Sequence, residues 1–202
     1  MNLPDSIRNF VDKFSKLPSI GPRQATRLAF HMIGEGKTEI DETIASLEGL
    51  KKMSICENCF FVFSPEDNEK LCEICLDKKR NSKIIALVEK ETDLISLEKT
   101  GKFRGRYFVI GCLAKNEVLN TEQKQRITKL KTTIEKELGG KADEIIIATN
   151  PTTYGDFNAA MLSKELKDYT QKITRLGRGI PTGGEIEFAD EETLGSALER
   201  RI

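Results

Sequence analysis

The chain lacks a net charge, a long apolar run and an N-terminal targeting segment. Its 32 lysines and arginines are balanced by 32 aspartates and glutamates, so no overall basic excess attracts nucleic-acid phosphates. No window approaches the roughly 20 apolar residues of a membrane helix, and the first residues lack the apolar core of a signal peptide. We therefore expect a cytoplasmic protein with no membrane contact.

Several enzymatic signatures are also missing. The sequence contains no P-loop, no GxSxG and no HExxH motif, and its one histidine, His31, falls in an expected helix. A packed or exposed helical role for His31 is favoured over that of a general base. With 38% hydrophobic residues and a mean hydropathy of -0.39, the composition is nevertheless that of an ordinary folded chain rather than a disordered one.

The strongest motif is a set of four cysteines in two CxxC pairs, Cys56, Cys59, Cys72 and Cys75. In a reducing compartment, cysteine pairs of this kind are expected to be metal ligands or buried thiols before any other role is considered. Four thiolates complete a tetrahedral Zn²⁺ shell and leave no position for water, which predicts one structural zinc ion per chain. Two redox dithiols or four unrelated buried cysteines are the alternatives. The fifth cysteine, Cys112, is expected to be a small buried hydrophobic residue.

Apolar spacing divides the chain into parts. Three helices are expected at the N-terminus, the first from Pro4 or Asp5, the second over 23–34 and the third capped by Asp41. After the cysteine segment, apolar runs at 84–88, 107–110, 144–148 and 172–176 alternate with helical patterns at 93–99, 121–138 and 157–169. This alternation predicts a parallel sheet with helices on both faces.

Charge is unevenly distributed along these parts. Residues 1–31 hold five basic and two acidic residues, whereas residues 32–50 hold one basic and five acidic residues. Further basic residues follow the cysteine segment: Lys78, Lys79, Arg80, Lys83, Lys99, Lys102, Arg104 and Arg106. A neutral total therefore conceals local basic stretches.

The first basic stretch surrounds the turn Leu-Pro-Ser-Ile-Gly-Pro-Arg at 17–23. Gly21 lies where the next helix starts, and the N-terminal end of a helix favours a phosphate. Arg23 and Arg27 would lie beside that anion, and Lys16 precedes the turn. We predict that these four residues contact the DNA backbone without reading sequence. The alternative is a helical-hairpin turn that binds no ligand.

Acidic residues occur near the ends of two expected strands. Glu89 follows the run at 84–88, Asp93 comes four residues later, and Asp156 follows the strand at 144–148. Because ligands bind at the carboxyl ends of parallel strands, these carboxylates are candidates for a weak divalent-cation or partner site. The alternative for each is a helix cap or a solvated charge.

The order of these parts closely resembles the RecR family of bacterial recombination mediators. The resemblance covers essentially the whole chain and includes Glu89-x3-Asp93, Ala-Thr-Asn-Pro-Thr at 148–152 and the segment Arg-Leu-Gly-Arg-Gly-Ile-Pro-Thr-Gly-Gly-Glu at 175–185. It implies a helix-hairpin-helix head at 1–53, a zinc finger at 54–80, a Toprim domain at 81–178 and a C-terminal oligomerisation tail at 179–202. It also implies a ring-like homotetramer that clamps double-stranded and gapped DNA and, with RecO and sometimes RecF, helps load the RecA recombinase.

Carried over residue by residue, the resemblance makes the four paired cysteines the zinc ligands, Glu89 the first Toprim glutamate, and Arg23 and Arg27 DNA-facing residues. Two departures weaken a metal site in the Toprim domain. Asn150-Pro151-Thr152 stands where Toprim enzymes have an Asp-x-Asp pair, as in RecR proteins, and Tyr154 replaces a glutamate common in the family. The usual loop after the second strand is also replaced, by Cys-Leu-Ala-Lys-Asn at 112–116.

The sequence therefore predicts a DNA clamp without catalytic activity. The basic hairpin, the closed zinc site and the missing acid pair, which two-metal phosphoryl chemistry requires, all favour this function. The rival is a Mg²⁺-dependent Toprim nuclease or primase-like enzyme that uses Glu89, Asp93 and Asp156.

Overall fold

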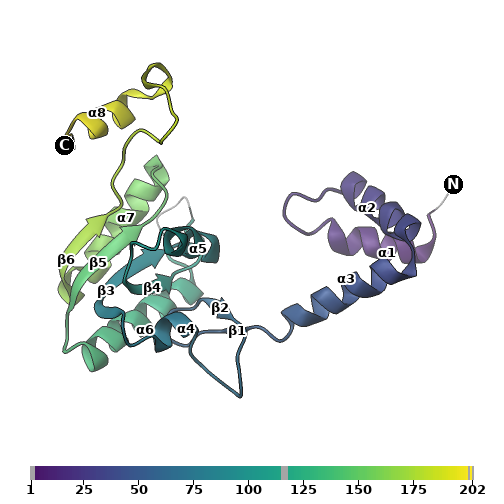
Figure 1. Cartoon of the computed structure of the whole chain (residues 1–202), viewed down its shortest axis with the longest axis horizontal. Helices are drawn as coiled ribbons and strands as arrows, with labels where there is room; N and C mark the ends of the chain where they lie inside the picture. The colour runs from purple at the N-terminus through teal and green to yellow at the C-terminus, as the bar shows by residue number, and fades with distance from the viewer. Residues whose placement is uncertain (1–2, 115–117, 200, 202) are drawn as a thin grey trace. The chain divides into compact units, whose positions relative to one another are not determined.

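The chain forms two compact units, Met1–Met53 and Ser54–Ile202. A computed structural model describes residues 3–114, 118–199 and 201, and Figure 1 traces their helices and strands. Lys115 and Asn116 of the loop after the second predicted strand lie outside the described residues. No described helix is both long and apolar enough to cross a membrane.

The N-terminal unit, here called the head, contains α1 (Asp5–Phe14), α2 (Pro22–Glu35) and α3 (Lys37–Leu50). The buried residues of α1 and α2 are Ile7, Ala25 and Ala29, which make up a small core. Small side chains on α2 allow the two helices to approach closely.

The start of α3 differs from the prediction. The sequence predicts Asp41 as the cap of this helix, but α3 begins at Lys37, and Gly36 is its N-cap residue. Gly36 has a φ of +100°, a left-handed conformation that glycine adopts at little cost. It therefore reverses the chain within one residue, and the helix starts five residues earlier than the cap signal indicates.

The second unit contains a four-stranded parallel sheet in the order β4-β3-β5-β6. Its strands are β3 (Asn81–Val88), β4 (Gly105–Val109), β5 (Ala142–Ala148) and β6 (Thr170–Arg175). The connecting helices are α5 (Glu91–Lys99), α6 (Thr121–Glu137) and α7 (Thr153–Leu166), followed by a 3-10 turn at Lys167–Tyr169. The predicted parallel α/β body is confirmed.

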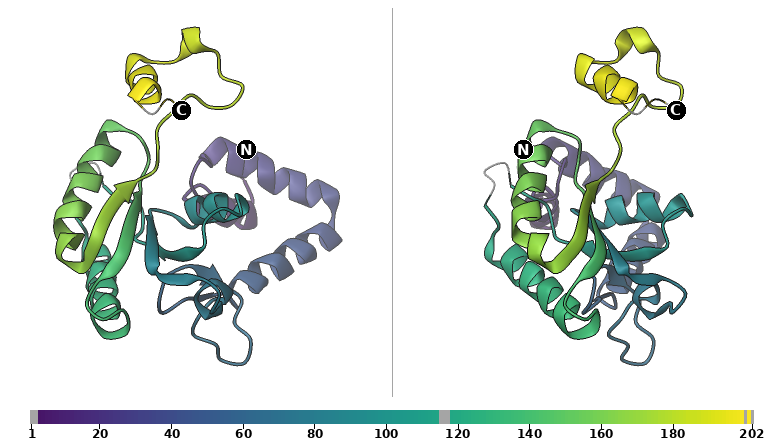
Figure 2. Two further views of the ribbon diagram at one scale, coloured as in Figure 1. Left: turned by 60° about the vertical axis from the view of Figure 1, so that its left-hand side comes forward. Right: turned by 90° about the vertical axis from the view of Figure 1, so that its left-hand side faces the viewer.

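The two faces of the sheet are covered differently. Leu87, Phe108 and Ile147 pack on one face against the buried side chains of α6 and α7. The other face packs against α5 and a cysteine knuckle made of β1 (Ser54–Ile55), β2 (Val62–Phe63) and α4 (Glu73–Leu76). Figure 2 shows the sheet between the green α7 and the teal α5. The knuckle therefore completes the core of the body, where the prediction had helices alone.

The chain ends in a tail with the 3-10 turn Ile186–Phe188 and α8 (Glu191–Glu199). Its large apolar side chains are mostly exposed, with Phe188 80% exposed and Ile186 69% exposed. Arg178 joins the tail to the body through ion pairs with Glu192 of α8 and Asp156 of α7.

A buried arginine joins the knuckle to the sheet. The Arg80 side chain is only 8% exposed, and its guanidinium donates to both carboxylate oxygens of Glu98 and, at 3.2 Å, to the Gly105 carbonyl. Asp77 lies 3.7 Å from Arg80 Nε. Arg80, aided by the Tyr107 hydroxyl, holds the pKa of Glu98 below its ordinary value against the opposing effect of burial.

Replacing Arg80 with Met should lower the free energy of unfolding by about 2 to 3 kcal/mol, because the Glu98 carboxylate loses its buried partner. A depressed carboxyl pKa stabilises the fold above the unfolded pKa, about 4.3, and that stabilisation is lost as the pH falls. The deficit of the variant should thus shrink below about pH 4. Urea unfolding at a series of pH values measures this deficit. The control is Arg104→Met at an exposed position, whose free energy of unfolding should stay within about 0.5 kcal/mol of the parent. A deficit that stays constant as the pH falls to about 2 would contradict the ion-pair explanation.

Candidate functional site

The four paired cysteines meet in one buried cluster. Cys56 follows β1, Cys59 ends the first tight turn, Cys72 is the N-cap residue of α4, and Cys75 lies within that helix. Their sulfurs all lie within 4.8 Å of one another, and none of the side chains is more than 6% exposed. The two CxxC turns therefore face each other, as their spacing predicts.

The backbone around the cluster is held by hydrogen bonds. Phe60 N donates to the Cys56 carbonyl at 3.0 Å, and Cys72 N donates to Cys56 Sγ at 3.4 Å. Val109 N of the edge strand β4 donates to the Cys59 carbonyl at 2.8 Å. The cluster is thus attached directly to the sheet that it covers.

The donor set fits a tetrahedral metal ion. Sulfurs bound at about 2.3 Å to a central Zn²⁺ lie about 3.8 Å apart, and Cys59 Sγ lies 3.5 Å from Cys72 Sγ. The neighbouring Cys56 sulfur and burial together raise the pKa values of Cys59 and Cys75. A cation at the centre would favour all four thiolates and offset their mutual repulsion. The cluster can hold one metal ion and leaves no coordination position for a substrate.

Cys112 is outside this cluster, and its predicted burial is wrong. The residue is exposed because it follows Gly111, whose φ of +94° directs the chain away from the sheet after β4. Its carbonyl accepts a hydrogen bond from Gln123 Nε2 at 2.8 Å, which fixes the backbone while the thiol remains accessible.

The hairpin turn of the head carries the predicted DNA contacts. Lys16, Arg23 and Arg27 are all exposed, and none of them takes part in an ion pair among the residues that the structure describes. Gly21 is the N-cap residue of α2, and its N–H donates to the Gln24 side chain at 2.9 Å. Arg23 and Arg27, four residues apart, lie on the same side of the helix.

The first turn of α2 suits an anion. Pro22 at the first helical position has no N–H to leave unpaired. The N–H groups of the next residues lie where an α-helix has no internal acceptor, and the helix dipole is positive there. Two exposed guanidinium groups lie beside this helix end, and their contact with backbone phosphate stays a prediction.

The three predicted carboxylates have different surroundings. Glu89, at the end of β3, is 8% exposed and accepts from Asn150 N at 3.4 Å. Asp93 caps α5 by accepting from Lys90 N at 3.0 Å. Asp156 pairs with Arg178 and with Arg175, and these cations lower the pKa of the carboxyl group.

These carboxylates do not form a three-ligand group. Over residues 3–114, 118–199 and 201, the cysteine cluster is the one set of three or more metal-ligating side chains with donor atoms within 4.8 Å. Two of the three acids are already bound by other groups of the chain, so a divalent-cation site stays a prediction. Sequence reasoning places Arg175 in the expected strand at 172–176 and Arg178 in the family segment at 175–185, and it misses their pairing with Asp156.

The loop between β5 and α7 is tightly constrained. Thr152 caps α7 by accepting from Gly155 N at 3.1 Å, and a Cβ on Gly155 would lie 1.9 Å from the Asn150 carbonyl oxygen. Glycine is therefore required where the backbone folds over Asn150. Tyr154, which stands in place of a glutamate, is 49% exposed on the same turn.

Comparison with known proteins identifies the parts of this chain. Residues 83–177 match a Toprim domain model, residues 7–48 match the RecR helix-hairpin-helix model, and residues 179–202 match the RecR C-terminal model.

Similar proteins match along almost their entire length. The recombination protein RecR of Herpetosiphon aurantiacus is 36% identical over 200 residues, covering 98% of this chain and 94% of the relative. The RecR proteins of Chloroflexus aurantiacus and Myxococcus xanthus are 38% and 35% identical, covering 96% and 98% of this chain and 93% and 98% of those relatives.

Proposed function

This chain belongs to the RecR family of recombination proteins, and we propose that it is a sequence-independent DNA clamp that acts in recombinational repair. The observation that carries the proposal is the exposed basic turn at the start of α2. Lys16, Arg23 and Arg27 lie around a helix N-terminus and form no ion pair within the described part of the chain. Phosphate is the ligand that such a set of groups favours.

The metal ion of the knuckle is zinc and its role is structural in this proposal. Four buried thiolates select a soft or borderline cation such as Zn²⁺, which they bind in a closed shell. The ligands are Cys56, Cys59, Cys72 and Cys75. The knuckle covers one face of the sheet, so the ion stabilises the fold and takes no part in a reaction.

Self-assembly completes the clamp. The four parts of the chain are a head at 1–53, a zinc finger at 54–80, a Toprim domain at 81–178 and an oligomerisation tail at 179–202. Exposed apolar side chains on the head, such as Phe30 and Leu47, and Phe188 in the tail support an assembly that buries them. We propose a homotetrameric ring in the cytoplasm that encircles DNA and works with RecO, and with RecF in some reactions, to load RecA at single-strand gaps.

The clamp has no catalytic activity in this proposal. Asp93 is occupied as a helix cap and Asp156 by two arginines, which leaves Glu89 without a second free carboxylate among the three predicted acids. Two-metal phosphoryl chemistry needs several carboxylates around its ions. The Toprim nuclease or primase-like function is therefore less well supported than the clamp.

Gapped circular DNA tests the clamp and its rival together. We expect the protein to remain on the circle during a high-salt wash, to be released when a restriction enzyme linearises the DNA, and to leave the DNA intact with Mg²⁺ present. Retention that survives linearisation would contradict encirclement. Mg²⁺-dependent cleavage or synthesis that disappears in Glu89→Gln would establish the enzyme instead.

A further inference from the structure

Two segments of the second unit contain basic residues and no acidic ones. Residues 78–83 hold four basic side chains, and residues 99–106 hold four more. In a chain whose charges balance overall, eight positive charges without a single acidic residue in either segment are a marked local excess.

The fold brings these segments together. Asn81 begins β3 and pairs with Gly105 at the start of the parallel strand β4, and Asn81 N donates to the Arg104 carbonyl at 2.8 Å. Both segments therefore lie at the edge of the sheet where the strands begin, opposite the edge that carries Glu89 and Asn150. Figure 1 shows β3 and β4 side by side in the body.

Two of the eight cations form ion pairs with nearby acidic side chains. Arg80 binds Glu98 and lies beside Asp77, and Arg106 Nη1 is 4.0 Å from Glu137. Two arginines thus pair with three carboxylates, so these acids leave one negative charge against the six remaining cations. Because Arg80 also donates to the Gly105 carbonyl, it fastens one segment to the other.

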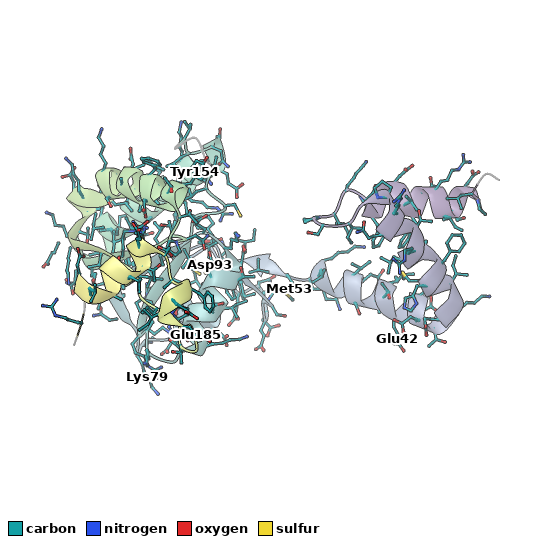
Figure 3. The ribbon with its side chains drawn as sticks, turned by 90° about the horizontal axis from the view of Figure 1, so that it is seen from above. Glu42, Met53, Lys79, Asp93, Tyr154 and Glu185 are labelled. Carbon is teal, nitrogen blue, oxygen red and sulfur yellow. The ribbon has the colours of Figure 1, made fainter. Side chains whose placement is uncertain are left out.

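Six cations remain exposed, and none of them has an ion pair with any residue that the structure describes. They form what we call the strand-start patch: Lys78, Lys79, Lys83, Lys99, Lys102 and Arg104. Figure 3 labels Lys79 at the margin of the body. A concentration of uncompensated positive charge of this kind attracts a polyanion.

We propose that the strand-start patch is a second nucleic-acid contact surface, which binds the phosphate backbone of DNA independently of the basic turn in the head. The inference rests on the proposed function in that its ligand is DNA. It places a phosphate-binding surface on the Toprim body itself, at the sheet edge opposite Glu89.

The composition of the patch favours DNA over an acidic protein. Five of its six cations are lysines, and neither segment contains an exposed large hydrophobic residue. Protein interfaces have cores depleted of lysine and enriched in aromatic residues. Backbone phosphates, in contrast, are held by lysine and arginine without an apolar anchor.

The test reverses Lys102 and Arg104 to glutamate in the full chain. We expect the Kd for duplex DNA at low salt to rise about tenfold or more, and the slope of log Kd against log salt to fall by up to about 2, or about 0.9 for each phosphate that is no longer neutralised. Single-stranded DNA is measured in parallel. The matched control, Lys124→Glu with Lys136→Glu on exposed positions of α6, makes the same change in charge and should have little effect.

The outcomes separate this surface from the head. Because the two surfaces carry different cations, Arg23→Glu with Arg27→Glu tests the turn of the head, and Lys102→Glu with Arg104→Glu tests the patch. An unchanged Kd and salt slope in the Lys102/Arg104 variant would overturn the proposal. So would unchanged DNA binding together with weakened polyglutamate binding, which would identify a site for an acidic protein.

Neutral variants guard against misfolding. Lys78→Gln with Lys79→Gln removes charge from the neighbouring segment without introducing repulsion, and the thermal unfolding midpoint checks that the fold is kept. This pair should also lower the salt slope, by about 1 to 2. A slope equal to that of the parent in this folded variant would count against the patch.

Discussion

Replacing Arg23 and Arg27 with glutamate should weaken duplex binding by about a hundredfold or more at low salt. The variant removes two exposed cations at the N-terminal end of α2 and places two anions there. Both the missing attraction and the new repulsion act at the same helix end, where the amide groups favour phosphate. If several subunits surround one duplex, each subunit repeats the effect.

Fluorescence anisotropy over a range of salt concentrations measures this effect. We expect the salt slope to fall by about 0.9 for each phosphate that the protein no longer neutralises. Lys51→Glu with Lys52→Glu is the matched control, since these residues are exposed beyond the end of α3 in the same head. Equal affinity and equal slope in the parent and the arginine variant would exclude the turn as a DNA-binding surface.

The elements whose signals are local could be predicted from the sequence. All four strands of the sheet and the helices between them are of this kind, because an apolar run or a helical spacing lies within each segment. The two CxxC turns are equally predictable from the sequence, since the spacing within each pair alone brings two sulfurs together. The cap signal at Asp41 gives the wrong start for α3 because Gly36, with its positive φ, ends α2 and starts α3.

What the sequence does not reveal depends on interactions between distant segments. Arg80 looks like one more cation in a basic stretch, yet it is buried against Glu98, 18 residues away. Asp156 looks like a candidate metal ligand, and its partners Arg175 and Arg178 lie 19 and 22 residues further along the chain. Such pairings follow from strand order, which the apolar pattern does not encode.

Replacing Cys72 with serine should cost the second unit most of its stability. Cys72 is fully buried, and its Sγ lies 3.5 Å from Cys59 Sγ. A structural zinc site contributes on the order of 10 kcal/mol of binding free energy to folding, so we expect a loss of at least about 4 kcal/mol in the free energy of unfolding. The zinc content should fall from about one ion per chain to near zero.

Cys112→Ser is the matched control for this experiment. It makes the same chemical change at an exposed thiol outside the cluster, so the zinc content should not change and the unfolding free energy should stay within about 0.5 kcal/mol of the parent. Elemental analysis of the purified protein and urea unfolding give both quantities. A Cys72→Ser protein that keeps the parental stability, or a parent that holds no metal, would contradict a structural four-thiolate site.

The size of the effect follows from where the knuckle lies. Val88, Tyr107 and Val109 of the sheet pack in the same buried cluster as the four cysteines. If the knuckle opens, this face of β3 and β4 loses its cover, and about 25 cal/mol is lost for each Å² of apolar surface exposed. Chelation of the metal from the parent should therefore also destabilise the sheet, whereas the head, a separate compact unit, should keep its helices. A chelator that melted the head and body together would show that the two units depend on each other for stability.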